Sequence, residues 1–156
     1  MGLSLKKDDM IKFLDDVKTP EETYSIMLWG TVSALINDFK GRSLASLIMA
    51  FTPAPGVGAS LTNAFCYMGL TEETFYAVAV DSYNTSNVIG TFRFPLKEIT
   101  SFNLRKGILG NSYSFGIICG GPASFTVKST SIGTDIKDQK ERMADFIEAI
   151  KPLVKQ

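Results

Sequence analysis

The sequence predicts a mainly β domain, a sandwich or a barrel, with one helix before it and one after it. Seven short apolar runs recur along the middle of the chain between turn-forming residues, which is the regular spacing of an all-β fold. A segment at each end instead repeats its apolar residues at helical spacing. The 156 residues, 45% of them hydrophobic and 21% charged, suffice for one domain with its own core. We therefore expect a single domain over residues 1–156.

Residues 1–20 are expected to form a helical arm. Between Ser4 and Val17, apolar residues recur every three or four positions among acids and lysines. They are Met10, Phe13, Leu14 and Val17. The sequence KTPEET follows, and there the helical pattern ends. The arm is therefore predicted to be an amphipathic helix with one apolar face.

Residues 22–130 are expected to hold the seven strands. The first, TYSIMLWGTVSALI, alternates along its length and is interrupted at Gly30, where we expect a bend. Its second face carries Trp29, which needs cover, and the N-terminal helix is the nearest candidate. Six later runs follow turn signals: LTNAFCYMGLT, TFYAVAVDSY, NVIGTFRF, ITSFNLRKGIL, SYSFGIIC and ASFTVKST.

The connection between the first two strands, KGRSLASLIMAFTPAPGVGAS, predicts a short helix over residues 43–51. Its apolar residues fall at i, i+3, i+4 and i+7: Leu44, Leu47, Ile48 and Phe51. Ser43 is a suitable N-cap, and the two prolines that follow stop the helix. The opposite side of this helix is small and uncharged, so we expect a second contact there.

Residues 136–153 are expected to form the C-terminal helix. In DQKERMADFIEAIKPL the apolar residues lie on one stripe: Met143, Phe146, Ile147 and Ile150. Asp138 followed by Glu141 has the spacing of a capping box. The stripe predicts that one side of this helix packs against the sheet.

Several segments together resemble the pleckstrin-homology-like (PH-like) domains of bacteria, over roughly Glu22 to Leu153. YMGLTEETFYAVAV and FPLKEITSFNLRKGILGNSYSFGI are similar to two of their hairpins, and KERMADFIEAIKPL is similar to the helix that closes one end of the barrel. The resemblance implies a seven-stranded antiparallel bent barrel capped by the C-terminal helix. It also implies a binding or assembly module, whose usual partners in this superfold are lipid headgroups and proteins.

The positions of the cations bear on the hypothesis that the domain binds lipid headgroups. The phosphoinositide site of the superfold is a cluster of cations on the first two strands and their connecting loop, and here those strands carry no Lys or Arg. Only Lys40 and Arg42, at the start of the loop, remain as candidate anion ligands. A multiply charged headgroup needs several charge-assisted contacts, so tight phosphoinositide binding is not expected. A second pair, Arg105 and Lys106, is interpreted as solvated hairpin charges toward a different corner.

The composition argues against catalysis. Without a histidine, the chain lacks the usual activator of Ser and Cys nucleophiles and the commonest metal ligand. No phosphate-binding glycine motif is present, and the acid pairs in PEET and TEET fall where solvated turns are expected. Cys66 and Cys119 lack metal-ligand spacing and are interpreted as small apolar residues. We therefore expect no enzymatic activity, no cofactor and no metal.

Charge and the N-terminal sequence narrow the partners and the location. The formal net charge is zero, which argues against nucleic acid as a partner. The start, MGLSLKKDDM, has charges where the apolar region of a signal peptide would lie. A cytoplasmic location is therefore expected.

Three functions remain open. The first is a protein-interaction or self-association module, with an interaction surface drawn from Trp29, Leu44, Leu47, Ile48, Met49 and Phe51. The second is peripheral binding of a membrane or lipid headgroup, in which Lys40 and Arg42 contact headgroups and the 40–51 segment enters the apolar layer. The third is an apolar small-molecule carrier, with the same segment as a lid over the barrel.

Overall fold

The computed structural model describes residues 5–35, 48–51, 60–81, 84–107, 112–118, 122–128 and 134–153. In chain order the elements are α1 (Lys7–Val17), β1 (Ile26–Leu35), β2 (Ile48–Phe51), β3 (Ser60–Leu70), β4 (Thr74–Val80), β5 (Val88–Pro95), η2 (Leu96–Glu98), β6 (Ser101–Lys106), β7 (Ser112–Ile118), β8 (Pro122–Lys128), α3 (Gln139–Ile150) and η3 (Lys151–Leu153). Seven of these strands coincide with the predicted runs. The eighth, β2, occupies the end of the predicted 43–51 helix.

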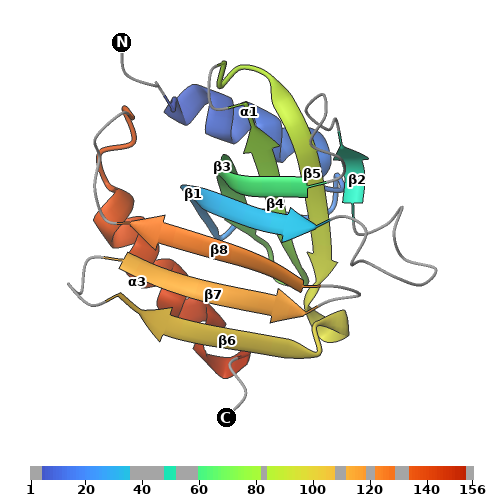
Figure 1. Cartoon of the computed structure of the whole chain (residues 1–156), viewed down its shortest axis with the longest axis vertical. Coiled ribbons are helices and arrows are strands. Elements are labelled where there is room, and N and C mark those ends of the chain that lie inside the picture. Colours follow the sequence, from blue (N-terminus) through green and yellow to red (C-terminus); the bar gives the residue numbers. More distant parts are fainter. Residues whose placement is uncertain are drawn as a thin grey trace.

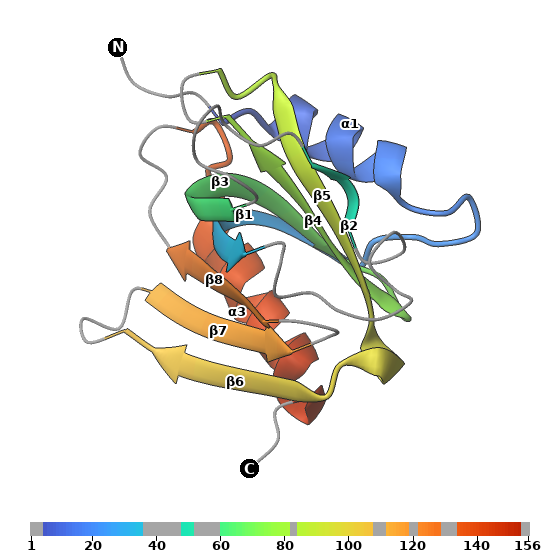
Figure 2. The same cartoon turned by 45° about the vertical axis from the view of Figure 1, so that its right-hand side comes forward.

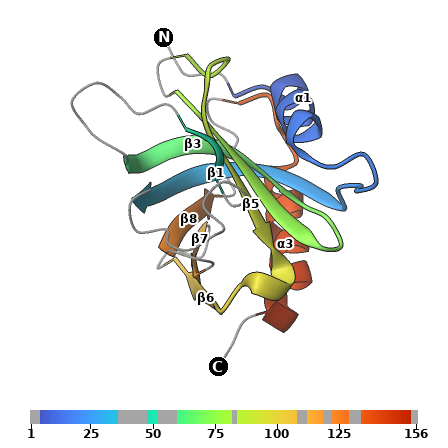
Figure 3. The same cartoon turned by 90° about the vertical axis from the view of Figure 1, so that its right-hand side faces the viewer.

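Within the part of the chain that the structure describes, the strands form one sheet in the order β2-β5-β4-β3-β1-β8-β7-β6. Every neighbouring pair is antiparallel. Figures 1 and 3 show that the sheet bends, so that β6, β7 and β8 form a layer of their own beside α3. The sheet is left open between β2 and β6, and with its closing helix it is consistent with the predicted PH-like fold.

The inner side of the bent sheet is filled by phenylalanine rings and by one face of α3. Phe75 meets Phe125 edge-on at 5.3 Å between ring centroids and lies 5.8 Å from Phe146 of α3. Phe115 stacks on Phe125 at 5.1 Å and on Phe102 at 5.3 Å. Each such pair contributes about 0.5–1.5 kcal/mol beyond the burial of its area. The predicted α3 stripe is confirmed, since all its members are buried: Met143, Phe146, Ile147 and Ile150.

The outer side of β1, β3 and β4 carries a second apolar cluster, which α1 covers. Figure 3 shows α1 on one side of these strands and α3 on the other. The buried members of the cluster are Leu5, Met10, Leu14, Trp29, Tyr67, Tyr76, Val78, Val80 and Ile136. Trp29 is only 4% exposed, so the prediction that the N-terminal helix shields it is confirmed.

The two ends of α1 are held by groups from distant parts of the chain. At its start no side chain caps the helix locally. Instead the Lys6 N–H donates to the Tyr67 hydroxyl at 3.1 Å, and the Lys7 N–H donates to the Asp135 carboxylate at 2.6 Å. At its end the Tyr24 hydroxyl donates to the Leu14 carbonyl at 2.6 Å. The two bonds at the start satisfy N–H groups that a helix leaves without an intrahelical partner, whereas the Leu14 carbonyl also accepts from the Lys18 N–H.

β1 gains a second neighbouring strand just after Gly30. Thr31, Val32 and Ala34 pair with both β3 and β8, whereas the residues up to Gly30 pair with β3 alone among the described strands. A Cβ on Gly30 would lie 2.4 Å from the Thr126 carbonyl oxygen of β8. The glycine therefore permits the close approach of β8, whereas the register irregularity of β1 lies between Val32 and Ala34 and not at Gly30, where a bend was predicted.

Two side chains of α3 form hydrogen bonds to the backbone of β1 in the part of this strand that does not pair with β8. The Gln139 amide donates to the Trp29 carbonyl at 2.8 Å and accepts from the Trp29 N–H at 3.5 Å. The Arg142 guanidinium donates to the Met27 carbonyl at 2.9 Å. Gln139 is fully buried, so its amide serves the backbone of β1 as a neighbouring strand would. Asp138 is the N-cap residue as predicted, but it makes no side-chain cap bond, and its carboxylate accepts from Arg142 instead.

We expect Gly30→Ala to destabilise the fold by about 1–3 kcal/mol, because the added methyl group must displace β8 or β1. Urea unfolding measures the change. Gly116→Ala is the matched control, since a Cβ there meets no atom within 4 Å. Equal losses of stability in both variants would contradict the proposed role of Gly30.

We expect Gln139→Leu to lower the free energy of unfolding by about 1–3 kcal/mol, because the Trp29 backbone groups lose a buried partner. Lys140→Leu, at the exposed neighbouring position of α3, is the control and should change stability by less than about 0.5 kcal/mol. A Gln139 variant as stable as the control would show that these hydrogen bonds contribute nothing.

Candidate functional site

The predicted 43–51 helix, and with it part of the predicted interaction surface, is not what the structure shows. Four predicted site residues lie outside the described residues: Lys40, Arg42, Leu44 and Leu47. Three lie in β2: Ile48, Met49 and Phe51. β2 pairs antiparallel with β5, so the helix prediction is wrong for this part of the segment. A short isolated helix is marginal in water, whereas the free edge of β5 supplies partners for the backbone.

Trp29 was predicted to belong to an interaction surface, and that prediction is wrong because the side chain is buried. Its ring centroid lies 6.3 Å from that of Phe65, within the cluster that α1 covers. The indole N–H makes no hydrogen bond to any described residue. The face of β1 that carries Trp29 is therefore already occupied by the chain itself.

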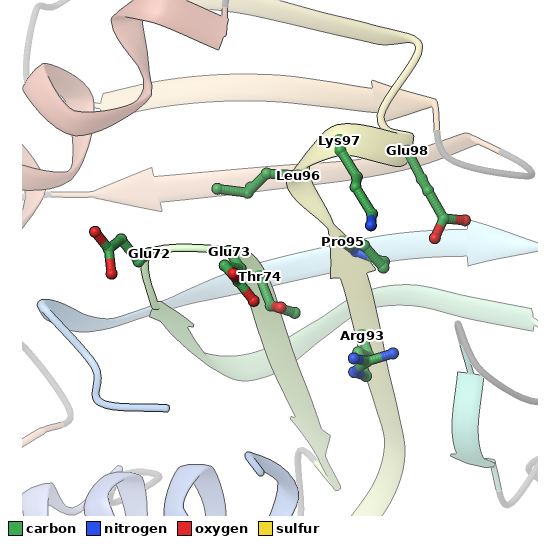
Figure 4. A pocket seen from close by; sticks show the side chains of 8 residues that line it. All are labelled: Glu72, Glu73, Thr74, Arg93, Pro95, Leu96, Lys97 and Glu98. Atoms are coloured by element: carbon green, nitrogen blue, oxygen red, sulfur yellow. The ribbon is translucent and has the colours of Figure 1, made fainter. Parts of the chain in front are cut away.

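A groove lies where the β3–β4 turn meets the end of β5. It consists of two adjoining cavities of about 420 and 470 Å³, which share Glu72, Glu73, Thr74 and Arg93. Figure 4 shows that the side chains lining the first come from the β3–β4 turn on one side and from β5 and η2 on the other. The lining of this corner groove includes five glutamates and two cations: Glu21, Glu22, Glu72, Glu73, Glu98, Arg93 and Lys97. This excess of carboxylates repels phosphate groups.

Glu22 ties the connection between α1 and β1 to the β3–β4 hairpin. Its carboxylate accepts from the Thr71 hydroxyl at 2.6 Å, from the Thr19 hydroxyl at 2.8 Å and from the Tyr76 hydroxyl. Burial raises the pKa of Glu22, but hydrogen bonds from Thr71, Tyr76, Thr19 and Thr74 outweigh it and lower the pKa from 4.5 to about 2. The carboxylate is already supplied with donors by its own chain, so its role is structural.

The β6 edge offers unpaired backbone groups. In the described sheet β6 is an end strand, visible at the bottom of Figures 1 and 2. The Gly107 N–H donates to the Ser112 carbonyl at 2.8 Å, and hydrogen-bonded and non-hydrogen-bonded pairs alternate along an antiparallel ladder. The N–H and C=O groups of Phe102, Leu104 and Lys106 therefore point away from β7. No described strand pairs with them.

The outer face of β6, β7 and β8 is polar except for the exposed Ile118, and its charged residues are cations. The three strands contain no acidic residue; alternation places Arg105 and Lys128 on the outer face, and Lys106 on the inner side at the β6 edge. A shallow hollow of about 390 Å³ lies on this face, with Arg105, Asn103, Ser114 and Gly116 among its lining residues. Gly116 lies beside Asn103 of β6 in the register and carries no side chain to fill the hollow. We call this face, together with the β6 edge, the β6 surface.

The sequence motifs PEET and TEET and the pair Arg105 and Lys106 indicate charged positions in the corner groove and on the β6 surface, but not how these positions are arranged in space. The acid pairs in PEET and TEET were interpreted as separate solvated turns, and the structure brings them to one groove. The two similar motifs are the only hint of this in the sequence. Arg105 and Lys106 are exposed, as a solvated interpretation requires, but they lie on an end strand. The position of β6 at the end of the sheet follows from the order of the strands, and the sequence of β6 alone does not indicate it.

The described residues contain no group of three or more potential ligands placed to hold a metal ion. Cys66 is buried and free, and burial raises the pKa of its thiol, which keeps it protonated and unreactive. Cys119 lies outside the described residues. No helix in the described part of the chain has the length and apolar character needed to cross a membrane.

The Glu22 contacts predict a stability that depends on pH. Because the folded-state pKa lies below the unfolded value, Glu22 stabilises the fold above about pH 4.5, and this contribution is lost as the pH falls toward 2. We expect Glu22→Gln to lower the melting temperature at pH 7 and to flatten its fall between pH 5 and 2, with Glu21→Gln as the exposed control. Parallel melting curves for wild type and Glu22→Gln across this range would contradict the assignment.

Comparison with known proteins identifies no family for this chain. No family model matches the chain, and no curated protein matches it. Among solved structures, the hSac2 domain from human phosphoinositide phosphatase Sac2 is similar, with a TM-score of 0.48 and 9% sequence identity. The similarity covers 94% of this chain and 82% of that chain. A likeness this distant carries no argument about function.

Proposed function

We propose that this chain is a non-catalytic protein-binding module of the PH-like class, and that an extended segment of its partner adds to β6 as a further strand. The observation that carries the proposal is the β6 edge. Phe102, Leu104 and Lys106 direct backbone donors and acceptors away from β7, and no described strand receives them. Strand addition to such an edge is a general mode of peptide recognition, in which the backbone gives affinity and the side chains give specificity.

The burial along β6 suits a strand partner. Phe102 is buried and Leu104 half-buried on the inner side, which holds the strand in place, while Asn103 and Arg105 are exposed on the outer side. An added strand would thus meet Phe102 and Leu104 followed by Lys106 on one face, and a polar row on the other. The PH-like resemblance, in which proteins are common partners, is consistent with this mode.

Self-association through the same edge is less favourable. Two copies paired through β6 would bring Arg105 and Lys106 of both chains into one pair of strands that carries no acid. Like charges close together on paired strands destabilise the pair. A different protein with a complementary segment avoids this repulsion, so we propose a heterologous partner.

The other two functions have weaker support. The interior expected to hold a carried molecule is packed with phenylalanine rings, including Phe75, Phe115 and Phe125. For membrane binding, the end of the 40–51 segment is a strand of the sheet rather than an amphipathic helix, and Lys40 and Arg42 lie outside the described residues.

Catalysis is not part of the proposal. The most perturbed carboxylate of the corner groove, Glu22, has a lowered pKa, which makes it a poor proton donor near neutral pH. Its hydrogen bonds to Thr71 and Thr19 serve the fold.

The proposal is tested with six-residue peptides of alternating apolar and polar residues, in acidic, neutral and basic versions. We expect at least one version to slow amide hydrogen exchange at Phe102, Leu104 and Lys106, whose N–H groups face the added strand, more than at Asn103 and Arg105. Lys106→Pro removes one of these donors, and proline is tolerated on edge strands. Lys106→Ala is the matched control, since it loses the same charge and keeps the N–H.

Affinity for the bound peptide should be roughly threefold to tenfold lower in the proline variant than in the alanine variant, the effect of one backbone hydrogen bond. If no version of the peptide slows exchange at β6, or if proline and alanine variants bind equally, the strand-addition mode is wrong.

A further inference from the structure

We infer that the segment bound by β6 is acidic, with two successive acidic residues beside Arg105 and Lys106 followed by an apolar residue beside Leu104. The inference rests on the proposed function, since it specifies the partner of the same edge. Three features of the β6 surface carry it: its charge, the alternation of its side chains and its open hollow.

The charge of the surface has one sign. β6, β7 and β8 contain three cations and no acid, although the whole chain has equal numbers of basic and acidic residues. Arg105 and Lys106 are exposed, and they lie on the strand whose edge is open. A strand added there would place its nearest side chains about 4.5–5.5 Å away, within reach of both cations. Acidic side chains are the complementary choice at these positions.

Alternation places the two cations on opposite faces of β6. Successive side chains of a strand point to opposite sides, so Arg105 lies on the outer face with Asn103, and Lys106 lies on the inner side with Leu104. An antiparallel added strand also alternates, so its first acid meets Lys106 and its second acid meets Arg105. Its third residue lies on the inner side again and meets Leu104, which is half-buried and apolar. The pattern specifies an order of residues as well as a charge.

The hollow leaves space for the side chain of the acidic residue that lies on the outer face beside Arg105. Arg105 is next to Ser114 in the register, and Asn103 is next to Gly116. A Cβ on Gly116 would meet nothing within 4 Å, so no β7 side chain crowds the row that holds Asn103. A carboxylate from the added strand can therefore lie across β6 and accept hydrogen bonds from the Arg105 guanidinium and the Asn103 amide.

The test uses the peptide Glu-Glu-Val-Thr-Val-Ser, which has this order for an antiparallel strand, and its reverse for a parallel strand. Versions with Gln in place of one Glu or of both measure the contribution of each charge. Binding is followed by titration with the labelled protein, reading the amide signals of β6. We expect each Glu to favour binding by roughly twofold to fivefold over Gln at low salt, as for exposed ion pairs. The advantage should shrink at high salt because the charges are exposed.

Two exposed substitutions assign each charge to its partner. For the antiparallel peptide, Arg105→Ala should abolish the advantage of Glu over Gln at the second position only, and Lys106→Ala should abolish it at the first position only. This reciprocal loss is not expected from general electrostatic attraction, which either variant would reduce at both positions. Both residues lie on the surface, so the variants should keep the melting temperature of the wild type.

The outcomes separate the inference from the proposed function. If Gln and Glu peptides bind equally and still slow exchange at β6, the strand mode holds and the acidic partner is wrong. If neither protects the β6 amides, the proposed function fails as well. If vesicles of phosphatidylcholine and phosphatidylserine bind through Arg105 and Lys106 without protecting these amides, the surface is a membrane contact and the inference is overturned.

Discussion

The fold depends on the point along β1 at which β8 joins β3 as a second neighbouring strand. At Gly30 the strand turns from a single partner to two, and the missing side chain lets the Thr126 carbonyl of β8 come close. Upstream of this point, Gln139 and Arg142 complete the backbone pairing of β1 from α3. The start of the β1–β8 pairing and the contacts of the closing helix therefore adjoin each other along β1. The two layers that enclose the phenylalanine core follow from this arrangement.

The bend also leaves two outer faces of different character. The outer face of β1, β3 and β4 is apolar and is covered by α1, so it forms a second core. The outer face of β6, β7 and β8 is polar and carries only cations among its charged residues. Because the covered face is held by Glu22 and by the bonds at the ends of α1, the open cationic face is the better candidate for a partner.

Patterns of apolar residues were sufficient to predict seven of the eight described strands and the helices α1 and α3. The stripe of α3 and the burial of Trp29 depend on local spacing, which the sequence contains directly. The helix prediction at Ile48–Phe51 failed because the edge of β5, distant in sequence, offers the segment backbone partners. The corner groove and the β6 edge were missed for a related reason. Both features depend on which strands become neighbours in the sheet. No local pattern in the sequence indicates which strands will be neighbours.

The way in which α1 is capped has a consequence for the order of folding. Its first-turn donors are satisfied by Tyr67 and Asp135, which are 61 and 128 residues away from the groups they bind. A helix of eleven residues has little stability alone, so we expect α1 to gain its helical form only after the sheet and the segment before α3 are in place. Although α1 precedes the strands in the chain, it should become ordered after them. Until then the apolar face around Trp29 stays exposed, and for a newly made chain that interval is the time of greatest exposure to aggregation.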